Sequence, residues 1–394
     1  MITVSTDKMK ILQRLENGEI TAAEALAMIG QFEKPADPPP PPSQQTPPPP
    51  PPDWGHHHDA FNEAPDWVSD IAGWVGNLVG DIADDIKDME VPVNISDFFG
   101  GTYSRNKRTE TFISNPISQS LAKLELHGKN DKIDIHVYDG DSVRIDCAYD
   151  ARRHDDYVQF HEENGTIGLF FDDKAMRSVK VVCQVPRVHI GELLAMTKNA
   201  EITLSGLVAD DVQLITKNAN VFIEAVTTKE LVAESRNANI KARGIAGGNI
   251  QLTTTNAKIS VEEIRARELI IKTTNAGVKT EFLDAEHLRI NTTNAGLKLE
   301  KALVGGLTQG FWDGERRIEA YTTNGNIRFG IPADMGVKLN AHASGGKITS
   351  DIPLYYSENM KSKVVGESVN YAASGRRMIV SLGTTNASVK LREV

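Results

Sequence analysis

Apolar and polar residues alternate along most of the chain after residue 98, and from Thr197 the pattern repeats every 19 residues. Within a repeat that begins at Thr197, positions six and eight are mostly apolar with a polar residue between them, and so are positions sixteen and eighteen. A period of two is typical of a half-buried strand, and no window inside a repeat has the period of a helix. A fixed repeat of this size indicates a solenoid. We therefore predict an all-β fold, a parallel β-helix or β-solenoid with coils of about 19 residues.

A four-residue signature recurs in every repeat. It reads TKNA, SRNA or TTNA in the regular run and returns later as TTNG and TTNA. Asparagine tolerates left-handed backbone and bonds locally, so we place the signature at a corner between strands and interpret it as a structural feature of the fold. Stacked asparagine amides can also bond one another in a ladder. The predicted ladder contains Asn199, Asn218, Asn237, Asn256, Asn275, Asn294, Asn324 and Asn386.

Residues 1–34 have the pattern of a small α-helical hairpin. Gly18 is the expected end of its first helix, and Thr21 with Glu24 forms a capping box for the second. So small a helical pair cannot bury much apolar surface alone. We therefore predict a module for interaction or oligomerisation, which contacts a protein partner, a second copy of the chain or the rest of the chain.

Residues 35–65 are predicted to be a proline-rich linker. The near-continuous proline runs 38–42 and 47–52 are typical of an extended, semi-rigid spacer. His56, His57 and His58 follow the second run. We interpret these histidines as solvated side chains, with weak metal binding as the alternative, because a linker offers no preset ligand geometry.

Residues 66–97 begin with an amphipathic helix over 66–89. Apolar residues, among them Trp67 and Trp74, recur at helical spacing, and aspartates occupy most of the other faces. A helix on a membrane surface usually carries Lys and Arg on its polar face. We therefore favour a helix that caps the open end or flank of the solenoid. The alternative is partner binding or peripheral membrane contact through Trp67 and Trp74.

The predicted solenoid domain covers residues 98–394. Over 98–188 the alternation is clean without the 19-residue register, and short turns indicate some antiparallel strands. Further on, the insertions 305–317 and 355–375 interrupt the register. Loops on one face of a solenoid often carry binding. Phe311 and Trp312, in the first insertion, are therefore candidate interaction residues.

Composition narrows the class of function. A net charge of −10 argues against nucleic acid and against simple attraction to anionic lipid. We expect Cys147 and Cys183, both in alternating segments, to be small buried side chains and not a disulfide. No stretch has the length of a membrane-spanning helix, and the N-terminus lacks the pattern of a signal peptide. These features predict a cytoplasmic location, with membrane association or non-classical export to the cell surface as the alternative.

No known catalytic motif is present in the sequence. We find no P-loop, dinucleotide fingerprint, zinc-protease motif or nucleophile elbow. The acidic pairs Asp210–Asp211 and Glu262–Glu263 are sequence neighbours, so on a strand their side chains point to opposite faces. We therefore predict no enzyme activity, no cofactor and no metal. The alternative is a β-helix that binds carbohydrate or processes polysaccharide, suggested by the fold and the loop around Trp312.

The repeats, together with VKLNAHASGGKITSDIP and TTNASVKL, resemble the bacterial adhesin-like β-strand-repeat family. The segment KILQRLENGEITAAEALAMI resembles the helical hairpin that precedes it in LiaX/YvlB-like proteins. That family is associated with the cell-envelope stress response of Gram-positive bacteria. The resemblance implies a non-enzymatic binding and regulatory protein, whose partner is an envelope regulator or a second copy of the chain. The proline runs and the histidine triplet depart from the family's pattern.

Overall fold

The computed structural model describes residues 107–151, 158–171, 176–302 and 315–394. These residues form strands and no helix, which confirms the all-β prediction for this part of the chain. No segment among them makes a helix that is long and apolar enough to span a bilayer. The predicted hairpin, linker and capping helix lie outside the described residues, as do Trp67, Trp74, Phe311 and Trp312.

The strands follow one another along the chain in three groups. The first group is β1 (Lys107–Ile113), β2 (Ser120–His127), β3 (Asn130–Tyr138), β4 (Arg144–Ala151), β5 (Val158–Glu163), β6 (Thr166–Phe171), β7 (Met176–Pro186), β8 (His189–Met196) and β9 (Ile202–Ser205). The second is β10 (Val208–Thr216), β11 (Val221–Ser235), β12 (Ile240–Thr254), β13 (Ile259–Lys272), β14 (Val278–Asn291) and β15 (Leu297–Ala302). The third is β16 (Arg316–Thr322), β17 (Ile327–Ile331), β18 (Gly336–Ala343), β19 (Ile348–Ser350), β20 (Leu354–Met360), β21 (Lys363–Ser368), β22 (Arg377–Thr384) and β23 (Val389–Glu393).

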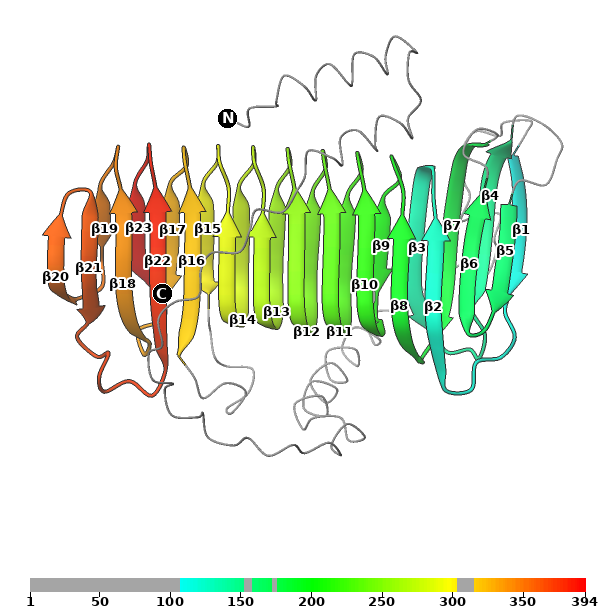
Figure 1. The fold of residues 1–394 in the computed structure, drawn as a ribbon, viewed down its shortest axis with the longest axis horizontal. Coiled ribbons are helices and arrows are strands. Elements are labelled where there is room, and N and C mark those ends of the chain that lie inside the picture. The colour runs from blue at the N-terminus through cyan, green and yellow to red at the C-terminus, as the bar shows by residue number, and fades with distance from the viewer. Residues whose placement is uncertain (1–106, 152–157, 172–175, 303–314) are drawn as a thin grey trace, which may run out of the picture. The chain divides into compact units, whose positions relative to one another are not determined.

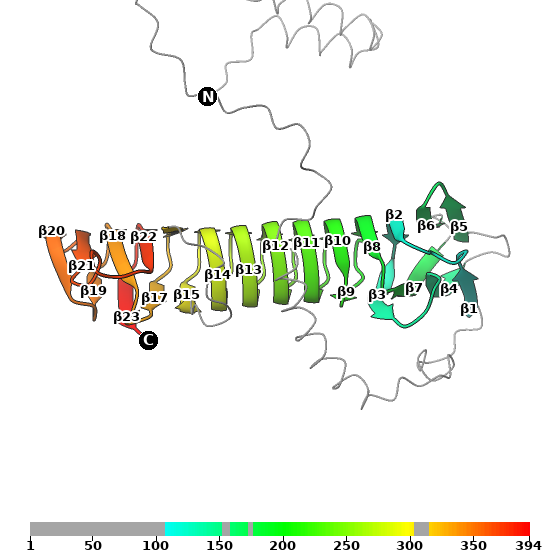
Figure 2. The same cartoon turned by 90° about the horizontal axis from the view of Figure 1, so that it is seen from below.

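Hydrogen bonds arrange these strands in two layers, which we call face A and face B (Figure 1; Figure 2). Face A follows the order β5–β6–β2–β8–β10–β11–β12–β13–β14–β16–β22–β18–β21–β20. Face B follows the order β1–β4–β7–β3–β9–β11–β12–β13–β14–β15–β17–β23–β19. The long strands β11 to β14 belong to both faces because each bends from one to the other.

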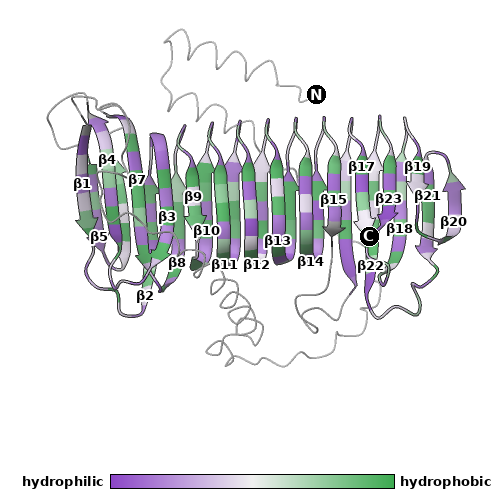
Figure 3. Ribbon diagram, turned by 180° about the vertical axis from the view of Figure 1, so that it is seen from behind, coloured by the Kyte–Doolittle hydropathy of each residue, from purple (hydrophilic) through white to green (hydrophobic). Residues whose placement is uncertain are grey.

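Neighbouring coils pair in parallel with residues that are 19 positions apart. Ile240 pairs with Ile259, and Ile259 pairs with Val278. All three side chains are buried. Figure 3 shows the resulting alternation of hydrophobic and hydrophilic residues along β10 to β14. Because inward residues pair with inward residues, aliphatic side chains stack on their own kind through the interior.

The asparagine signature forms the corner where each coil passes from face A to face B. Each asparagine donates from Nδ2 to Oδ1 of the asparagine in the preceding coil; for Asn256 and Asn237 the distance is 2.6 Å. The structure adds Asn130 to the predicted set, because Asn199 donates to its Oδ1 at 2.5 Å. The ladder runs through Asn130, Asn199, Asn218, Asn237, Asn256, Asn275, Asn294, Asn324 and Asn386.

The hydroxyl of the signature makes a second set of bonds between coils. Buried Thr254 donates from Oγ1 to the carbonyl oxygen of Ala238 at 3.4 Å, and buried Thr384 donates to that of Gly325 at 3.0 Å. The backbone amide of Asn256 also donates to Arg236 of the preceding coil, at 3.0 Å. The signature therefore supplies hydrogen-bond partners for backbone groups at the corner. These groups lie outside the strand ladders and would otherwise lack such partners.

The repeat asparagines do not adopt a left-handed backbone, so that expectation is wrong. The left-handed residue of each coil lies instead at the bend opposite the signature corner. Position ten of the repeat makes the bend from face B to face A with a single residue of positive φ. The residues are Gly206 (73°), Ala225 (53°), Gly244 (61°), Glu263 (55°) and Phe282 (54°). The signature corner spreads its turn over four residues and needs no such conformation. Asn130, with a φ of 57°, is the one ladder asparagine of the described chain that adopts it.

Both ends of the stack depart from sequence order. The coil β22–β23 lies between β16–β17 and β18–β19, which precede it in the chain. The coil β2–β3 lies between β6–β7 and β8–β9, which follow it. Antiparallel pairs β1–β4, β4–β7 and β5–β6 occur in the first region, as the turns there predict. The second expected insertion, 355–375, contributes the antiparallel pair β20–β21, which extends face A.

Replacing Asn256 by aspartate tests the ladder. The carboxylate still accepts from Asn275 but cannot donate to Asn237, so two oxygens face each other. We expect chemical denaturation to show a loss of about 1–2 kcal/mol at pH 7. The loss should shrink below pH ~4, where the protonated acid donates again. Thr274→Asp, which puts a charge at the same corner outside the ladder, is the control, and equal stability of the two variants would contradict the ladder.

Substitutions at Gly206 test the bend. A Cβ there lies 3.6 Å from that of Val137, an ordinary contact, so any cost comes from the backbone conformation. Gly206→Ala should lose about 1 kcal/mol or less, because a less flexible unfolded chain offsets part of the left-handed cost. Gly206→Val should lose more, since β-branched residues are strongly disfavoured there. Thermal melts should rank glycine, alanine and valine in this order, and Gly375→Ala, which meets no atom within 4 Å, should melt like the native chain.

Candidate functional site on face B

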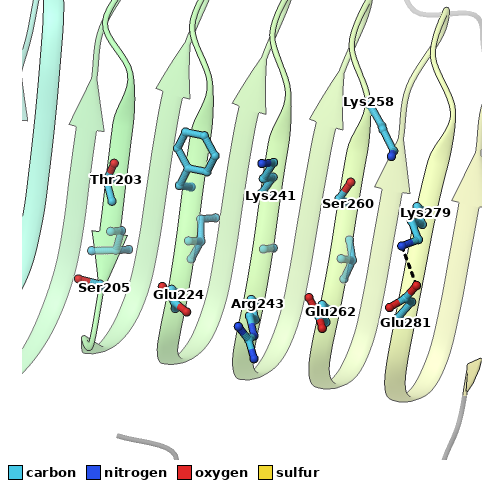
Figure 4. Close-up of a pocket in the computed structure, with 15 residues that line it drawn as sticks. Thr203, Ser205, Glu224, Lys241, Arg243, Lys258, Ser260, Glu262, Lys279 and Glu281 are labelled. Carbon is cyan, nitrogen blue, oxygen red and sulfur yellow. Dashed lines mark ion pairs between the residues drawn. The ribbon is translucent and has the colours of Figure 1, made fainter. Parts of the chain in front are cut away.

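An open groove of about 350 Å³ crosses the outer side of face B over β9 and β11 to β14 (Figure 4). Two rows of outward side chains line it, because positions seven and nine of the repeat alternate with buried positions six and eight. The row at position seven consists of Thr203, Phe222, Lys241, Ser260 and Lys279. The row at position nine consists of Ser205, Glu224, Arg243, Glu262 and Glu281.

The charges of the groove are sorted across the strands. Lys241 and Lys279 lie toward the signature corner, where Lys258 joins them, while Glu262 and Glu281 lie toward the bend (Figure 4). The cation row continues beyond the groove, because Lys279, Lys298, Arg328 and Lys390 are register partners on β14, β15, β17 and β23. Face B therefore carries a positive row, interrupted by Ser260 between Lys241 and Lys279, beside a shorter negative row that is interrupted by Arg243.

Local contacts hold several of these groups in place. Lys279 Nζ lies 2.6 Å from Glu281 Oε1, and Arg243 Nε lies 3.3 Å from Glu263 Oε2. The ammonium of Lys241 lies 5.3 Å from the centre of the Phe222 ring, a cation–π distance. The paired side chains remain partly exposed to solvent, which screens their charges, so the pairs contribute little to stability. Their effect is to orient the charges.

The electrostatics of the groove favour permanent charge. The hydrogen bond that Lys279 donates to Glu281 raises the pKa of Lys279, and the charge of Glu263 raises the pKa of Arg243. A general base needs the opposite, a lysine whose pKa is lowered toward neutrality. Glu263 occupies the left-handed bend and binds Arg243, and the charge of Glu262 acts on the same guanidinium, so the prediction that these two side chains point to opposite faces is not supported. The arrangement is suited to binding.

The two cysteine thiols, which are potential nucleophiles, lie in surroundings typical of structural residues. Cys147 and Cys183 are buried free thiols, as predicted, and burial raises the pKa of both, to about 12 for Cys147. Thiols of this kind are poor nucleophiles. Among the residues described, no three His, Cys, Asp or Glu side chains are grouped so that they could hold a metal ion.

A column of carboxylates lies on face A. Asp211 pairs in register with Glu192 on one side and Glu230 on the other. Burial raises the pKa of Asp211, and the charges of Glu230, Asp210 and Glu192 raise it further. For Asp210, burial acts in the same direction, but hydrogen bonds from Lys229 and His189 outweigh it and leave the pKa lowered. Both aspartates are half-buried between buried Ala209 and Val212, and both interact with Lys229, so the prediction that their side chains point to opposite faces is wrong here.

Most of the repeats and strands, and all the residues that line the groove, lie in a region that a known family model matches. The model, described as Toastrack DUF4097, matches residues 121–381. The chain belongs to the Toastrack family. The Toastrack region includes the whole groove and both rows of side chains. No curated protein matches the chain.

Several solved structures are similar to this Toastrack chain. A candidate adhesin from Parabacteroides merdae is 12% identical, with 73% of this chain and 96% of that chain covered and a TM-score of 0.41. A candidate adhesin from Parabacteroides distasonis is also 12% identical, with coverages of 73% and 97% and a TM-score of 0.42. A candidate lipid-binding protein from Parabacteroides distasonis is 12% identical, with coverages of 72% and 96% and a TM-score of 0.33.

The groove was missed by sequence reasoning, which identified no site among the outward positions of the repeat. A signal was nevertheless present in the aligned repeats. Lysine at position seven is followed by glutamate at position nine in two successive Toastrack coils, as Lys279 with Glu281 and Lys298 with Glu300. The structure pairs both, the second at 2.8 Å. The predicted asparagines, by contrast, bind one another at the corner, and the groove does not include Asn256 or its neighbours in the regular coils β12 to β14.

The Asp211→Asn variant tests the carboxylate column. The folded state holds the pKa of Asp211 above its ordinary value, so the charged form costs stability, and this cost is present above the folded pKa. The variant should therefore melt at a higher temperature than the native chain at pH 7. The difference should disappear as the pH falls below about 3.9, where the aspartate is protonated in both states. Equal melting temperatures at pH 7 would mean that neither burial nor the neighbouring carboxylates destabilise the charged form of Asp211.

Proposed function

We propose that the chain is a non-enzymatic binding and regulatory protein whose groove on face B holds a protein partner. The observation that carries the proposal is the sorting of charge into a cation row and a carboxylate row, in register over successive coils. Side chains two residues apart on a strand are roughly 6.6 Å apart, and coils are about 4.8 Å apart. A polypeptide that lies along the stack can therefore meet both rows at once.

The mixed charge favours protein over a polymer of one sign. A nucleic acid strand placed on Lys241 and Lys279 would also meet Glu262 and Glu281, which repel it. A protein segment can present carboxylates to the first row and cations to the second, and such complementarity gives specificity and fast association. Half-buried Phe222 adds an apolar contact inside the groove. Aromatic residues of this kind often act as anchors in protein interfaces.

The place of this binding in the cell follows from the resemblance of the repeats and of residues 1–34 to envelope-stress proteins. In the proposal, the helical hairpin binds a regulator or a second copy of the chain. The linker of residues 35–65 holds it apart from the helix of 66–89 and from the coils of about 19 residues. The solenoid then presents the groove to the partner. The proposed partner is cytoplasmic or, under the alternative location, lies at the membrane or the cell surface.

A charge reversal tests the groove. The full chain carries a photo-crosslinking residue at position 260, inside the groove, and is exposed to lysate from envelope-stressed and unstressed cells. We expect a discrete protein adduct that weakens when salt rises from about 50 to 300 mM, because exposed charges are screened. The double variant Lys241→Glu/Lys279→Glu should reduce the adduct at least about fivefold, an effect on the order of 1 kcal/mol.

The control variant carries one lysine-to-glutamate change on the other face. Lys272→Glu alters an exposed lysine of face A that belongs to the same coil as Ser260. It should crosslink like the native chain, and a crosslinker at position 251 on face A should give no such adduct. If the double variant and the native chain gave identical adducts in both lysates, the groove would not be the binding site.

A further inference from the structure

A second pocket, of about 390 Å³, lies on face A and differs in chemistry from the groove. Strands β14, β16, β22 and β18 supply its lining, which contains no lysine, arginine, aspartate or glutamate. Its polar groups are instead amides, hydroxyls and one imidazole, among them those of Asn291, Asn340, Ser381 and His342. In a chain in which charged residues make up 24% of the sequence, so neutral a pocket is unusual.

The pocket contains an aromatic platform. Tyr321 pairs in register with Gly383, and Gly383 pairs with His342. A Cβ at position 383 would lie only 2.6 Å from Cδ1 of Tyr321, so the glycine allows the ring to cover the backbone of β22. Glycine weakens a strand interior and often marks a close approach of this kind. Tyr321 nevertheless remains 43% exposed as a residue, which leaves surface open to a ligand.

The remaining polar groups surround this platform. His342 lies on β18, the strand beyond Gly383, and its Nε2 is 2.8 Å from Oγ of Ser344, a bond that orients the imidazole. Asn340 is two residues before it on the same strand, and therefore on the same side of the sheet. Asn291 pairs with Tyr321 from the opposite side. Hydrogen-bonding side chains therefore lie on both sides of the ring.

We propose that this pocket binds a neutral sugar residue of a glycan, with the sugar ring stacked on Tyr321. The electron-rich face of an aromatic ring attracts the weakly positive C–H groups of a pyranose. Amides, hydroxyls and imidazole both donate and accept hydrogen bonds, as sugar hydroxyls do. The volume falls in the usual range for small-ligand sites. A nucleotide could stack on the same ring, but its phosphates would find no cation among the lining residues.

The test is titration of the full chain with neutral tetrasaccharides. Calorimetry and saturation-transfer NMR monitor the binding of chitotetraose, cellotetraose, maltotetraose and mannotetraose. We expect at least one of them to bind with a Kd of about 1 mM or tighter. Tyr321→Ala should weaken that binding at least about tenfold, whereas Tyr321→Phe should retain it, because the ring face is kept. Gly383→Val should also weaken sugar binding, because the new side chain displaces the ring of Tyr321. This variant keeps the tyrosine itself, so it tests the position of the ring.

Two controls separate this site from other surfaces. Tyr356→Ala removes a tyrosine on β20 that is 48% exposed and does not line the pocket, so binding should be unchanged. Lys241→Glu/Lys279→Glu should also bind sugar like the native chain, so the outcome is independent of the partner proposed for face B. Circular dichroism checks that each variant is folded. The proposal is overturned if no tetrasaccharide binds below about 10 mM, or if Tyr321→Ala and Gly383→Val both bind as tightly as the native chain.

Discussion

The parallel pairing of one coil with the next is the constraint on which the rest of the structure depends. Each coil buries aliphatic side chains only if its register matches that of both neighbours, because a shift by one residue would turn every inward side chain outward. The backbone bonds alone do not choose between registers. The asparagine ladder and the buried threonine hydroxyls do, because the ladder joins equivalent positions of successive coils and each hydroxyl reaches the fourth residue of the preceding signature. The short signature is therefore the part of each repeat that varies least.

Much of this architecture could be predicted from the sequence, because the signature and the apolar positions both repeat along the chain. The strands, the corner and eight ladder asparagines follow from that periodicity. Asn130 could not be found in this way, since no threonine-asparagine signature surrounds it and it meets Asn199 across 69 residues of chain. The bend from face B to face A also gave no signal. Its left-handed position holds glycine, alanine, glutamate or phenylalanine, so backbone geometry is shared there without a shared residue type.

The surfaces were less predictable than the core for a related reason. Inward positions must fit their neighbours in every coil, whereas outward positions are free to vary, and a binding surface appears only when several coils are aligned in space. The lysines of face B become a row because Lys279, Lys298, Arg328 and Lys390 share a register, although insertions separate the later ones in sequence. The two faces can thus carry different chemistry, charged on face B and locally neutral around Tyr321, on one common interior.

The placement of β22–β23 within the stack affects the order of assembly during synthesis. A solenoid whose coils follow sequence order can grow one coil at a time as the chain leaves the ribosome. Here β18 and β19 are synthesised before the coil that joins them to β16 and β17, so that end of the stack holds an open slot until β22 and β23 arrive. Open strand edges attract other chains in the meantime. The neutral pocket, which needs Gly383 beside Tyr321, comes into existence only when this slot closes, so any ligand held there would report that the C-terminal part of the stack is complete.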